Sequence, residues 1–426
     1  MENKNGSQRH HSVRHFFRNL GPGLITGAAD DDPSGISTYS TAGAAFGYGM
    51  LWTALFTLPL MTAVQLMCAR IGLVSGRGLA AVLRRYYSRP VLWFACSLLL
   101  IANTVNIAAD LSGMAEAAEL LTGWNSLWFT PLFTFSILAL LIFSSYRLMA
   151  RIFKWLTLVL FAYVGAAFLA HPDWAAIARA TVTPQFRFDR DYLMTFIAIL
   201  GTTISPYLFF WQAAQEVEEE KAEGKMTVGR RMGATAEQLR DARNDVMTGM
   251  SFSVLVFYFI ILTTGATLHL HGQHDIRTAR EAAEALRPLA GDLASLLFSA
   301  GLIGTGFLGV PVLAGSAAYA VAEGAAWRAG MNERPRMAKK FYAVVAIAML
   351  AGMSLDYAGV NAIRMLFLAA VLNGLLAPPL IILILLVSNN PRVMGAHRNG
   401  RGLNLLGLLT AGLMTFAAAA MLLSWV

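Results

Sequence analysis

Residues 27–35 read Gly27-Ala28-Ala29-Asp30-Asp31-Asp32-Pro33-Ser34-Gly35, and this stretch decides the fold of the chain. It lies within an otherwise apolar segment that runs from residue 20 to residue 47. A proline removes a backbone hydrogen-bond donor and clashes with the preceding helical turn. In lipid, unpaired backbone is tolerated only where protein covers it or where it lines a water-filled cavity. The stretch therefore predicts a membrane helix that is broken near its middle.

The three carboxylates at this break indicate a functional site. A charged side chain at the centre of a bilayer costs at least about 2.5 kcal/mol, so it marks function by default. One alternative is that the span starts later and that the Asp triplet caps a helix at the membrane surface, because Asp is a good N-cap residue. The apolar pair Leu24-Ile25 upstream of the triplet argues against this alternative.

The composition of the whole chain is that of a membrane protein. Of its 426 residues, 56% are hydrophobic and 14% are charged, and the mean hydropathy is +0.55. Soluble domains hold about 25% charged residues. Because a spanning helix needs roughly 20 mostly apolar residues, we predict an all-α membrane protein with about eleven transmembrane helices. Their predicted ranges are 20–47, 49–74, 91–121, 126–143, 150–170, 191–217, 246–270, 292–323, 339–355, 361–387 and 403–425.

The distribution of positive charge predicts the orientation of these helices. Lys and Arg concentrate in alternate loops, and the positive-inside rule places those loops and residues 1–19 in the cytoplasm. The net charge of +8 is thus a topology signal, and we expect no nucleic-acid partner. The polar, basic N-terminal segment lacks the features of a cleavable signal peptide. We therefore expect one transmembrane domain, residues 20–426, in a bacterial inner membrane, with no extramembrane catalytic head.

A second interrupted span predicts an internal symmetry. The sixth span contains Gly201-Thr202-Thr203-Ile204-Ser205-Pro206-Tyr207, again with small and polar residues before a proline. The two breaks are five spans apart, so the second half enters the membrane from the opposite side. Broken helices at corresponding positions of two inverted halves point to the central binding site of a transporter. We predict repeats over about 20–170 and 191–387, with an additional helix over about 403–425.

Oxygen atoms dominate the predicted site. An unwound stretch frees backbone carbonyls, which together with one or two carboxylates make a site for a hard cation. Consecutive residues point in different directions, so the three Asp side chains cannot all face one ion. In the third span, Asn106 and Asp110 lie at helical spacing and are expected to face the bundle, as is Asn373 in the tenth. Hydrogen bonding between helices is the alternative role for these polar residues.

Several motifs resemble one family in order along almost the whole chain. They are Gly21-Pro22-Gly23-Leu24, Asp32-Pro33-Ser34-Gly35-Ile36, Ala42-Gly43-Ala44, Gly47-Tyr48 before Leu51-Trp52, Ala109-Asp110-Leu111, Ser205-Pro206 and Asn389-Asn390-Pro391-Arg392-Val393-Met394-Gly395. Together they resemble the NRAMP divalent-metal transporters. The resemblance implies a LeuT-type fold, with helices 1 and 6 unwound and a metal site between them.

The resemblance also implies which residues form the site. The family's first-helix motif is Asp-Pro-Gly-Asn, in which Asp32 matches the Asp and Gly35 takes the place of the Asn. Its sixth-helix motif is Met-Pro-His, in which Ser205 and Tyr207 replace Met and His around the matching Pro206. The metal ligands expected here are Asp32, Asp31, Gly35, Thr202 and Ser205. Residues expected in the pathway or behind the ligands are Asp30, Asn106, Asp110, Tyr207, Gln212 and Asn373.

The departures from the family motif predict the substrate. A Met ligand favours soft or borderline ions, whereas Ser205 leaves oxygen ligands in a roomier site that suits a largely hydrated Mg²⁺. NRAMP-related magnesium transporters also lack this Met. We therefore expect transport of Mg²⁺ with Mn²⁺ as a second substrate. Since Tyr207 and Gln212 replace the family's two sixth-helix His residues and His is the side chain that titrates near neutral pH, we expect weak or no proton coupling.

The sequence also leaves other functions as alternatives. They are a proton-coupled Mn²⁺/Fe²⁺ transporter, an organic-substrate symporter of the same fold, an intramembrane enzyme with paired aspartates, and a channel. The acidic triplet would repel a substrate carboxylate, and Asp110 is the one candidate for a catalytic partner. We expect no enzyme activity and no cofactor, because the metal ion is the transported substrate. The protein is expected to lie in the lipid bilayer, and a monomer is compatible with the sequence.

Three histidines fall in the predicted outward loop after the seventh span. We interpret His269, His271 and His274 as solvated loop residues, with capture of metal at the entrance as the alternative.

Overall fold

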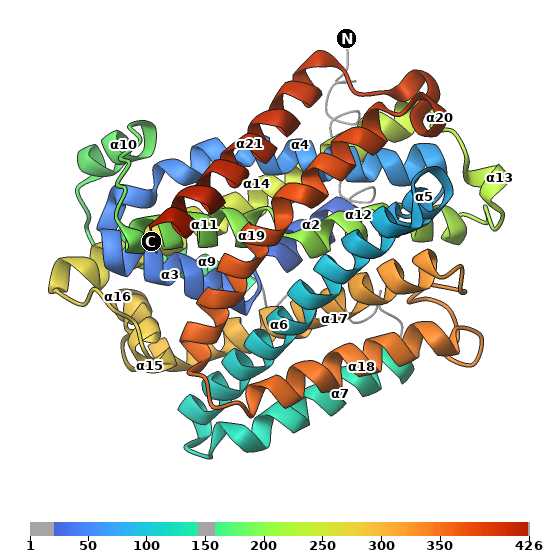
Figure 1. The fold of residues 1–426 in the computed structure, drawn as a ribbon. Helices are drawn as coiled ribbons and strands as arrows, with labels where there is room; N and C mark the ends of the chain where they lie inside the picture. Colours follow the sequence, from blue (N-terminus) through green and yellow to red (C-terminus); the bar gives the residue numbers. More distant parts are fainter. Residues whose placement is uncertain (1–20, 144–157, 425–426) are drawn as a thin grey trace, which may run out of the picture.

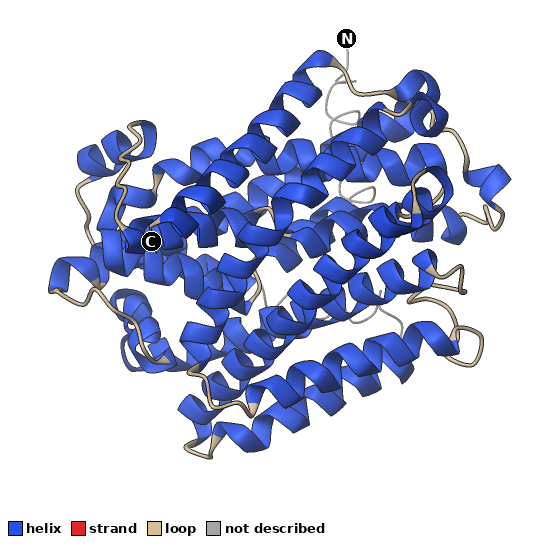
Figure 2. Ribbon diagram, in the orientation of Figure 1, coloured by secondary structure: helices blue, strands red, loops and turns tan. Residues whose placement is uncertain are grey.

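The structure is a computed structural model that describes residues 21–143 and 158–424. All regular structure in these residues is helical, as Figures 1 and 2 show. The first half contains α2 (Pro22–Asp30), α3 (Pro33–Phe46), η1 (Gly47–Met50), α4 (Trp52–Ser75), α5 (Leu79–Tyr86), α6 (Arg89–Thr122), η2 (Ser126–Trp128), α7 (Phe129–Phe143), η3 (Leu158–Leu160), α9 (Phe161–Leu169) and α10 (Trp174–Val182). The second half contains α11 (Arg190–Thr203), α12 (Pro206–Ala222), α13 (Val228–Arg231), α14 (Ala236–Thr267), η4 (His269–His271), α15 (Ala279–Ala283), η5 (Glu284–Leu286), α16 (Arg287–Ala290), η6 (Gly291–Leu293), α17 (Ala294–Gly324), α18 (Lys339–Asp356), α19 (Ala362–Asn389), α20 (Pro391–Met394), η7 (Gly395–His397) and α21 (Arg401–Leu423).

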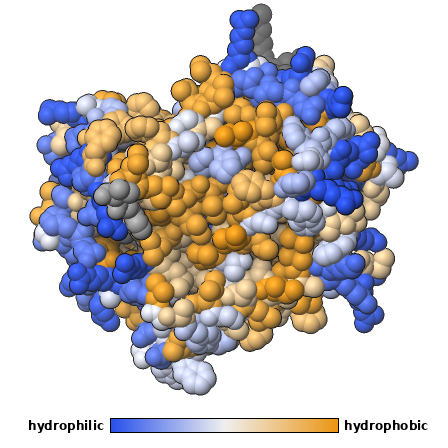
Figure 3. Space-filling view, viewed as in Figure 1, coloured by the Kyte–Doolittle hydropathy of each residue, from blue (hydrophilic) through white to orange (hydrophobic). Residues whose placement is uncertain are grey.

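The helices form a bundle with an apolar belt. Within the described residues, eight helical stretches are long and apolar enough to cross a membrane. Figure 3 shows a hydrophobic band across the middle of the visible face, with hydrophilic residues gathered mainly at its left and right ends. Leu408 and Phe416 of α21 are each 62% exposed. Large apolar side chains on an outer surface fit contact with lipid, so the bundle is embedded in a membrane.

The other three predicted spans lie in the expected order. The first corresponds to α2 and α3 together, and the ninth to α18. The fifth corresponds to α9, while the part of it before residue 158 lies outside the described residues, as does the predicted cytoplasmic segment 1–19. The prediction for the seventh span was wrong at its start, since α14 begins at Ala236 rather than at residue 246. A capping box formed by Thr235 and Gln238 extends this helix through a polar segment that hydropathy does not detect.

Both predicted breaks are present and have the same local cause. The first lies at Asp31 and Asp32, between α2 and α3, and Asp32 has extended backbone (φ −71°, ψ 174°) before Pro33. The second lies at Ile204 and Ser205, and Ser205 is likewise extended (φ −78°, ψ 133°) before Pro206. A residue before proline is pushed out of the helical region, and proline is well suited to begin the next helix.

Close backbone packing places the first break deep in the bundle. Helix α2 lies against α14, and a Cβ atom added at Gly27 would lie 2.1 Å from the carbonyl oxygen of Gly249. In the same contact, a Cβ atom added at Gly249 would lie 2.0 Å from the carbonyl oxygen of Gly23. Such approach is possible only without side chains, as is common where membrane helices pack. Helix α3 then continues between α14 and α19.

Candidate functional site

Asp32 stands at the first break and caps α3. Its Oδ1 atom accepts hydrogen bonds from the backbone N–H of Gly35 (2.8 Å) and from the hydroxyl of Ser34 (2.9 Å). The side chain is 2% exposed. A capping carboxylate satisfies free N–H groups at the start of a helix. The position of the Asp32 carboxylate is therefore fixed both by the break before Pro33 and by its hydrogen bonds to the start of α3.

The second break meets the first through Tyr207. The phenol hydroxyl of Tyr207 lies 2.9 Å from the carbonyl oxygen of Ala29 and 3.2 Å from Oδ2 of Asp32, and donates to these acceptors. Ser205 lies at the second break, and its hydroxyl donates to the carbonyl oxygen of Thr202 at the end of α11 (2.6 Å). A Cβ atom at Gly35 would lie 3.3 Å from Oγ1 of Thr202, so this residue of α3 packs directly on α11. The structure thus brings five of the predicted residues, from both broken spans, to one buried location.

Asp30 and Asp31 face a different helix from Asp32. The hydroxyl of Ser253 on α14 lies 2.6 Å from Oδ2 of Asp30 and 3.4 Å from Oδ1 of Asp31. The second oxygen of each of these two carboxylates is buried without a hydrogen-bond partner. The triplet is therefore divided, with Asp32 directed to α12 and the other two carboxylates to α14. Sequence reasoning missed Ser253, because nothing marks this serine within its apolar helix.

Asp110 approaches the site from α6. Both of its carboxylate oxygens are buried without a hydrogen-bond partner. A Cβ atom added at Gly309 of α17 would lie 3.0 Å from Cβ of Asp32 and 3.7 Å from Oδ2 of Asp110. The space between the two carboxylates is therefore kept open by the missing side chain of Gly309. Sequence reasoning missed Gly309 as well, since glycines are frequent in membrane helices.

The remaining predicted residues make contacts between helices. Asn106 of α6 and Asn373 of α19 exchange two amide hydrogen bonds, of 2.8 Å and 3.0 Å. Gln212 of α12 accepts from the hydroxyl of Thr26 (2.6 Å) and donates to Oε1 of Glu216 (2.9 Å). Gln212 therefore joins α12 to α2 away from Asp32, and the two asparagines join α6 to α19.

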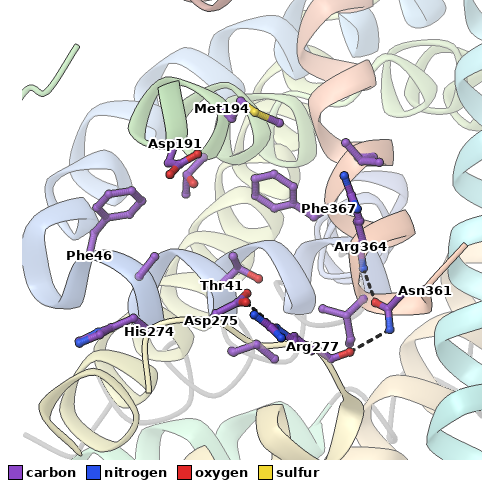
Figure 4. Close-up of a pocket in the computed structure, with 15 residues that line it drawn as sticks. Thr41, Phe46, Asp191, Met194, His274, Asp275, Arg277, Asn361, Arg364 and Phe367 are labelled. Atoms are coloured by element: carbon purple, nitrogen blue, oxygen red, sulfur yellow. Dashed lines mark hydrogen bonds and ion pairs between the residues drawn. The ribbon is translucent and has the colours of Figure 1, made fainter. Parts of the chain in front are cut away.

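A pocket of about 790 Å³ opens at one end of the bundle. Figure 4 shows residues of α3, α11 and α19 around it, together with residues of the segment that follows η4. Its labelled residues are Thr41, Phe46, Asp191, Met194, His274, Asp275, Arg277, Asn361, Arg364 and Phe367.

A second pocket, of about 360 Å³, contains the N-terminal end of α2 and the C-terminal part of α12. Carboxylates dominate it: Glu216, Glu219, Glu220, Glu223, Asp241 and Asp245. The α3 and α11 halves of the broken spans thus line the larger pocket, and the start of α2 and the end of α12 line the acidic one. In each span the break lies between the parts that line the two pockets. Asp32 lines neither of these two pockets, so the site is closed off from both in this state.

The possible metal ligands at Asp32 are oxygen atoms of several chemical types: carboxylate, hydroxyl and backbone carbonyl. In the described part of the chain, no set of three or more His, Cys, Asp or Glu side chains is arranged to hold a metal ion. At Asp32 the structure brings together one carboxylate, the hydroxyl of Tyr207 and the carbonyl of Ala29. The second break adds the hydroxyl of Ser205, which is bonded to the carbonyl of Thr202. Oxygen donors of these types suit hard divalent cations.

Comparison with known proteins decides the family. Residues 23–424 match the family described as "Natural resistance-associated macrophage protein-like", Nramp. The chain belongs to the Nramp family. A protein of Yersinia pestis named divalent metal cation transporter MntH is 27% identical over 415 residues, covering 95% of this chain and 94% of that protein. The MntH protein of Deinococcus radiodurans is 29% identical over 304 residues, covering 69% of this chain and 66% of that protein.

Solved structures agree with this Nramp assignment. The manganese transporter of Eremococcus coleocola superimposes with a TM-score of 0.75 at 18% identity, covering 98% of this chain and 87% of that one. Mhp1, a nucleobase-cation-symport-1 family transporter, superimposes with a TM-score of 0.57 at 15% identity, covering 95% of this chain and 92% of that one. These likenesses confirm the LeuT-type fold. The family match and the MntH relatives, rather than these structures, make this Nramp protein a membrane transporter and not an enzyme.

Proposed function

We propose that this Nramp protein transports divalent metal cations by alternating access, with the ion bound at Asp32 between the two breaks. The carrying observation is that both broken spans line a pocket at each end of the bundle and meet at a buried carboxylate between those pockets. Movement of the α2 and α12 halves opens one side, and movement of the α3 and α11 halves opens the other. The names of the bacterial relatives support the class of substrate.

The donors around Asp32 favour Mg²⁺ and Mn²⁺ over softer ions. Ser205 offers a hydroxyl where the family motif has a thioether, and the neighbouring donors are also oxygens. Mg²⁺ binds oxygen ligands and keeps several of its waters, and Mn²⁺ accepts the same carboxylate, carbonyl and water ligands. In this proposal Asp32, Thr202 and Ser205 contact the ion, while Gly35 shapes the site and Asp31 balances its charge. Asp30, Asp110 and Tyr207 line the pathway.

Proton coupling is proposed to be weak or absent. The sequence holds eight histidines, at positions 10, 11, 15, 171, 269, 271, 274 and 397, and none belongs to α2, α3, α11 or α12. The broken spans therefore lack the side chain that titrates near neutral pH without perturbation.

With the N-terminus in the cytoplasm of the cell, the pocket lined by His274 faces outward and the acidic pocket faces inward.

The test is uptake by the purified protein in liposomes under Mg²⁺ and Mn²⁺ gradients, read by a luminal metal dye. We expect saturable uptake of both ions and its loss in Asp32→Ala. The matched control is Asp292→Ala, which removes an exposed carboxylate in η6 and should leave uptake unchanged.

Two results would count against the proposal. Flat traces from well-folded protein would favour an organic substrate, and undiminished uptake by Asp32→Ala would remove this carboxylate from the site. A luminal pH dye in the same vesicles tests coupling. Acidification that follows metal uptake and disappears in Asp110→Asn would contradict weak coupling.

A further inference from the structure

Two histidines converge at the mouth of the larger pocket. Nδ1 of His269, in η4, lies 3.1 Å from Nδ1 of His274, and the ring centroids are 4.6 Å apart. The carbonyl oxygen of Ala44, near the end of α3, lies 2.7 Å from Nδ1 of His269 and 3.4 Å from Nδ1 of His274. Three electronegative atoms thus form a triangle whose edges are 2.7, 3.1 and 3.4 Å.

Hydrogen bonds can satisfy this triangle, but only by bringing two N–H groups close together on the one carbonyl oxygen. A carbonyl oxygen only accepts, and a neutral imidazole carries one N–H. If Nδ1 of His269 donates to Ala44, then Nδ1 of His274 either holds a lone pair facing that carbonyl or brings a second proton close to the first. One cation in place of the protons would satisfy all three atoms at once.

Two of the three edges agree with ligands on one transition metal ion, and the 2.7 Å edge between Nδ1 of His269 and the Ala44 oxygen must lengthen by about 0.2 Å when an ion replaces the proton. With metal–nitrogen distances of about 2.0–2.1 Å, two ligands lie about 2.9 Å apart at a right angle and about 3.4 Å apart at the tetrahedral angle. The nitrogen–nitrogen distance of 3.1 Å falls between these values. Imidazole suits Zn²⁺, Ni²⁺, Cu²⁺ and Fe²⁺, whereas Mg²⁺ prefers oxygen ligands.

We propose that His269, His274 and the Ala44 carbonyl bind a transition metal ion at the mouth of the larger pocket. His269 is partly buried and His274 is exposed, so solvent reaches the site and completes the coordination with water. His274 and Asp275 also line the larger pocket. The ion therefore sits at the pocket's rim. This site has a preference for borderline ions, in contrast to the oxygen donors around Asp32.

Binding of Zn²⁺ to the purified full-length Asp32→Ala protein tests this proposal, because that variant lacks the central carboxylate. Titration calorimetry should detect a Zn²⁺ site in Asp32→Ala and no Mg²⁺ binding at the same site. Removing a residue that hydrogen-bonds to a metal ligand lowers metal affinity about 10- to 100-fold. Removing the ligand itself should lower the affinity further. We expect at least about a 100-fold weakening when His269→Ala or His274→Ala is added.

The matched control is His271→Ala. His271 belongs to the same short helix, but its Nδ1 atom is hydrogen-bonded to the carbonyl of Thr267 at 2.5 Å, outside the triangle. Unchanged Zn²⁺ affinity in this control, with loss in the other two, supports the proposal. Equal affinity in all three variants, or an equal loss in all three, overturns it.

A second measurement needs no substitution. Zn²⁺ should protect His269 and His274 from diethyl pyrocarbonate in the unaltered protein, while His271 remains reactive, as read by peptide mass spectrometry. Equal modification of all three residues with and without Zn²⁺ overturns the proposal. Neither experiment measures transport, so failure here is distinct from failure of the function proposed for Asp32.

Discussion

Asp245 holds the start of α2 and gives the most detailed prediction. Its carboxylate on α14 accepts hydrogen bonds from the backbone N–H groups of Gly21 (2.9 Å), Gly23 (2.6 Å) and Leu24 (3.2 Å). These bonds form only while α2 rests on α14. Under alternating access, the carboxylate therefore keeps the acidic pocket closed towards Asp32.

The size of the effect follows from these three bonds. Hydrogen bonds to a charged group contribute about 1.5–3 kcal/mol each, and removal of a helix cap costs about 0.5–2 kcal/mol. Water replaces part of the lost bonding once α2 moves, and one of the bonds is long. We therefore take about 2–4 kcal/mol for Asp245→Ala, which shifts the open population about 30- to 700-fold at 1.4 kcal/mol per factor of ten.

Thiol labelling of α2 measures this shift. Ala28→Cys places a reporter at a residue that is 8% exposed, and the native Cys68 and Cys96 are both buried. The labelling rate of this reporter by a water-soluble maleimide should rise strongly in Asp245→Ala and less in Asp245→Asn, because Asn keeps one acceptor oxygen. The control is Asp241→Ala, which lines the same pocket but takes no part in the three hydrogen bonds. Equal labelling rates in folded Asp245→Ala and Asp241→Ala would refute the reasoning.

Three further predictions concern the site and its supporting contacts. Gly309→Val should weaken metal binding by about 1–3 kcal/mol, the usual cost of overpacking, because its Cβ would lie 3.0 Å from Cβ of Asp32; unchanged affinity in a metal titration would contradict this. Ser205→Met should raise Cd²⁺ uptake relative to Mg²⁺ uptake in liposomes, because a thioether prefers softer ions, and an unchanged ratio would remove the ligand-softness argument. Asn106→Leu should lower the free energy of unfolding by about 1–3 kcal/mol, because it leaves the Asn373 amide unpaired. The double variant Asn106→Leu with Asn373→Leu should recover part of this loss in thermal unfolding. An equal or larger loss in the double variant would argue against the pair.

The family and the larger part of the fold were predictable because their causes are local in sequence. Proline removes a backbone donor, and with the small and polar residues before them Pro33 and Pro206 marked both interruptions. Proline alone does not mark a break, because Pro59, Pro311, Pro378 and Pro379 lie inside helices that continue. Apolar stretches of spanning length placed the helices in order, and the motif around Asp32 identified the family. The start of α14 was missed because its first ten residues are mostly polar or charged and begin at the capping box of Thr235.

The partners of each polar residue depended on tertiary structure. Asp32 lies 175 residues from Tyr207 along the chain, and Asp30 lies 223 residues from Ser253. Nothing in the triplet itself reveals that its carboxylates face two different helices, or that Gly309 keeps the space beside Asp32 open.

The sequence by itself determined that a membrane helix breaks at a buried carboxylate, because proline geometry and the cost of charge in lipid act within a few residues. Only the tertiary structure decided what surrounds that carboxylate. The reason is physical: hydrogen bonds and close packing join atoms that the fold brings together, whatever their separation along the chain.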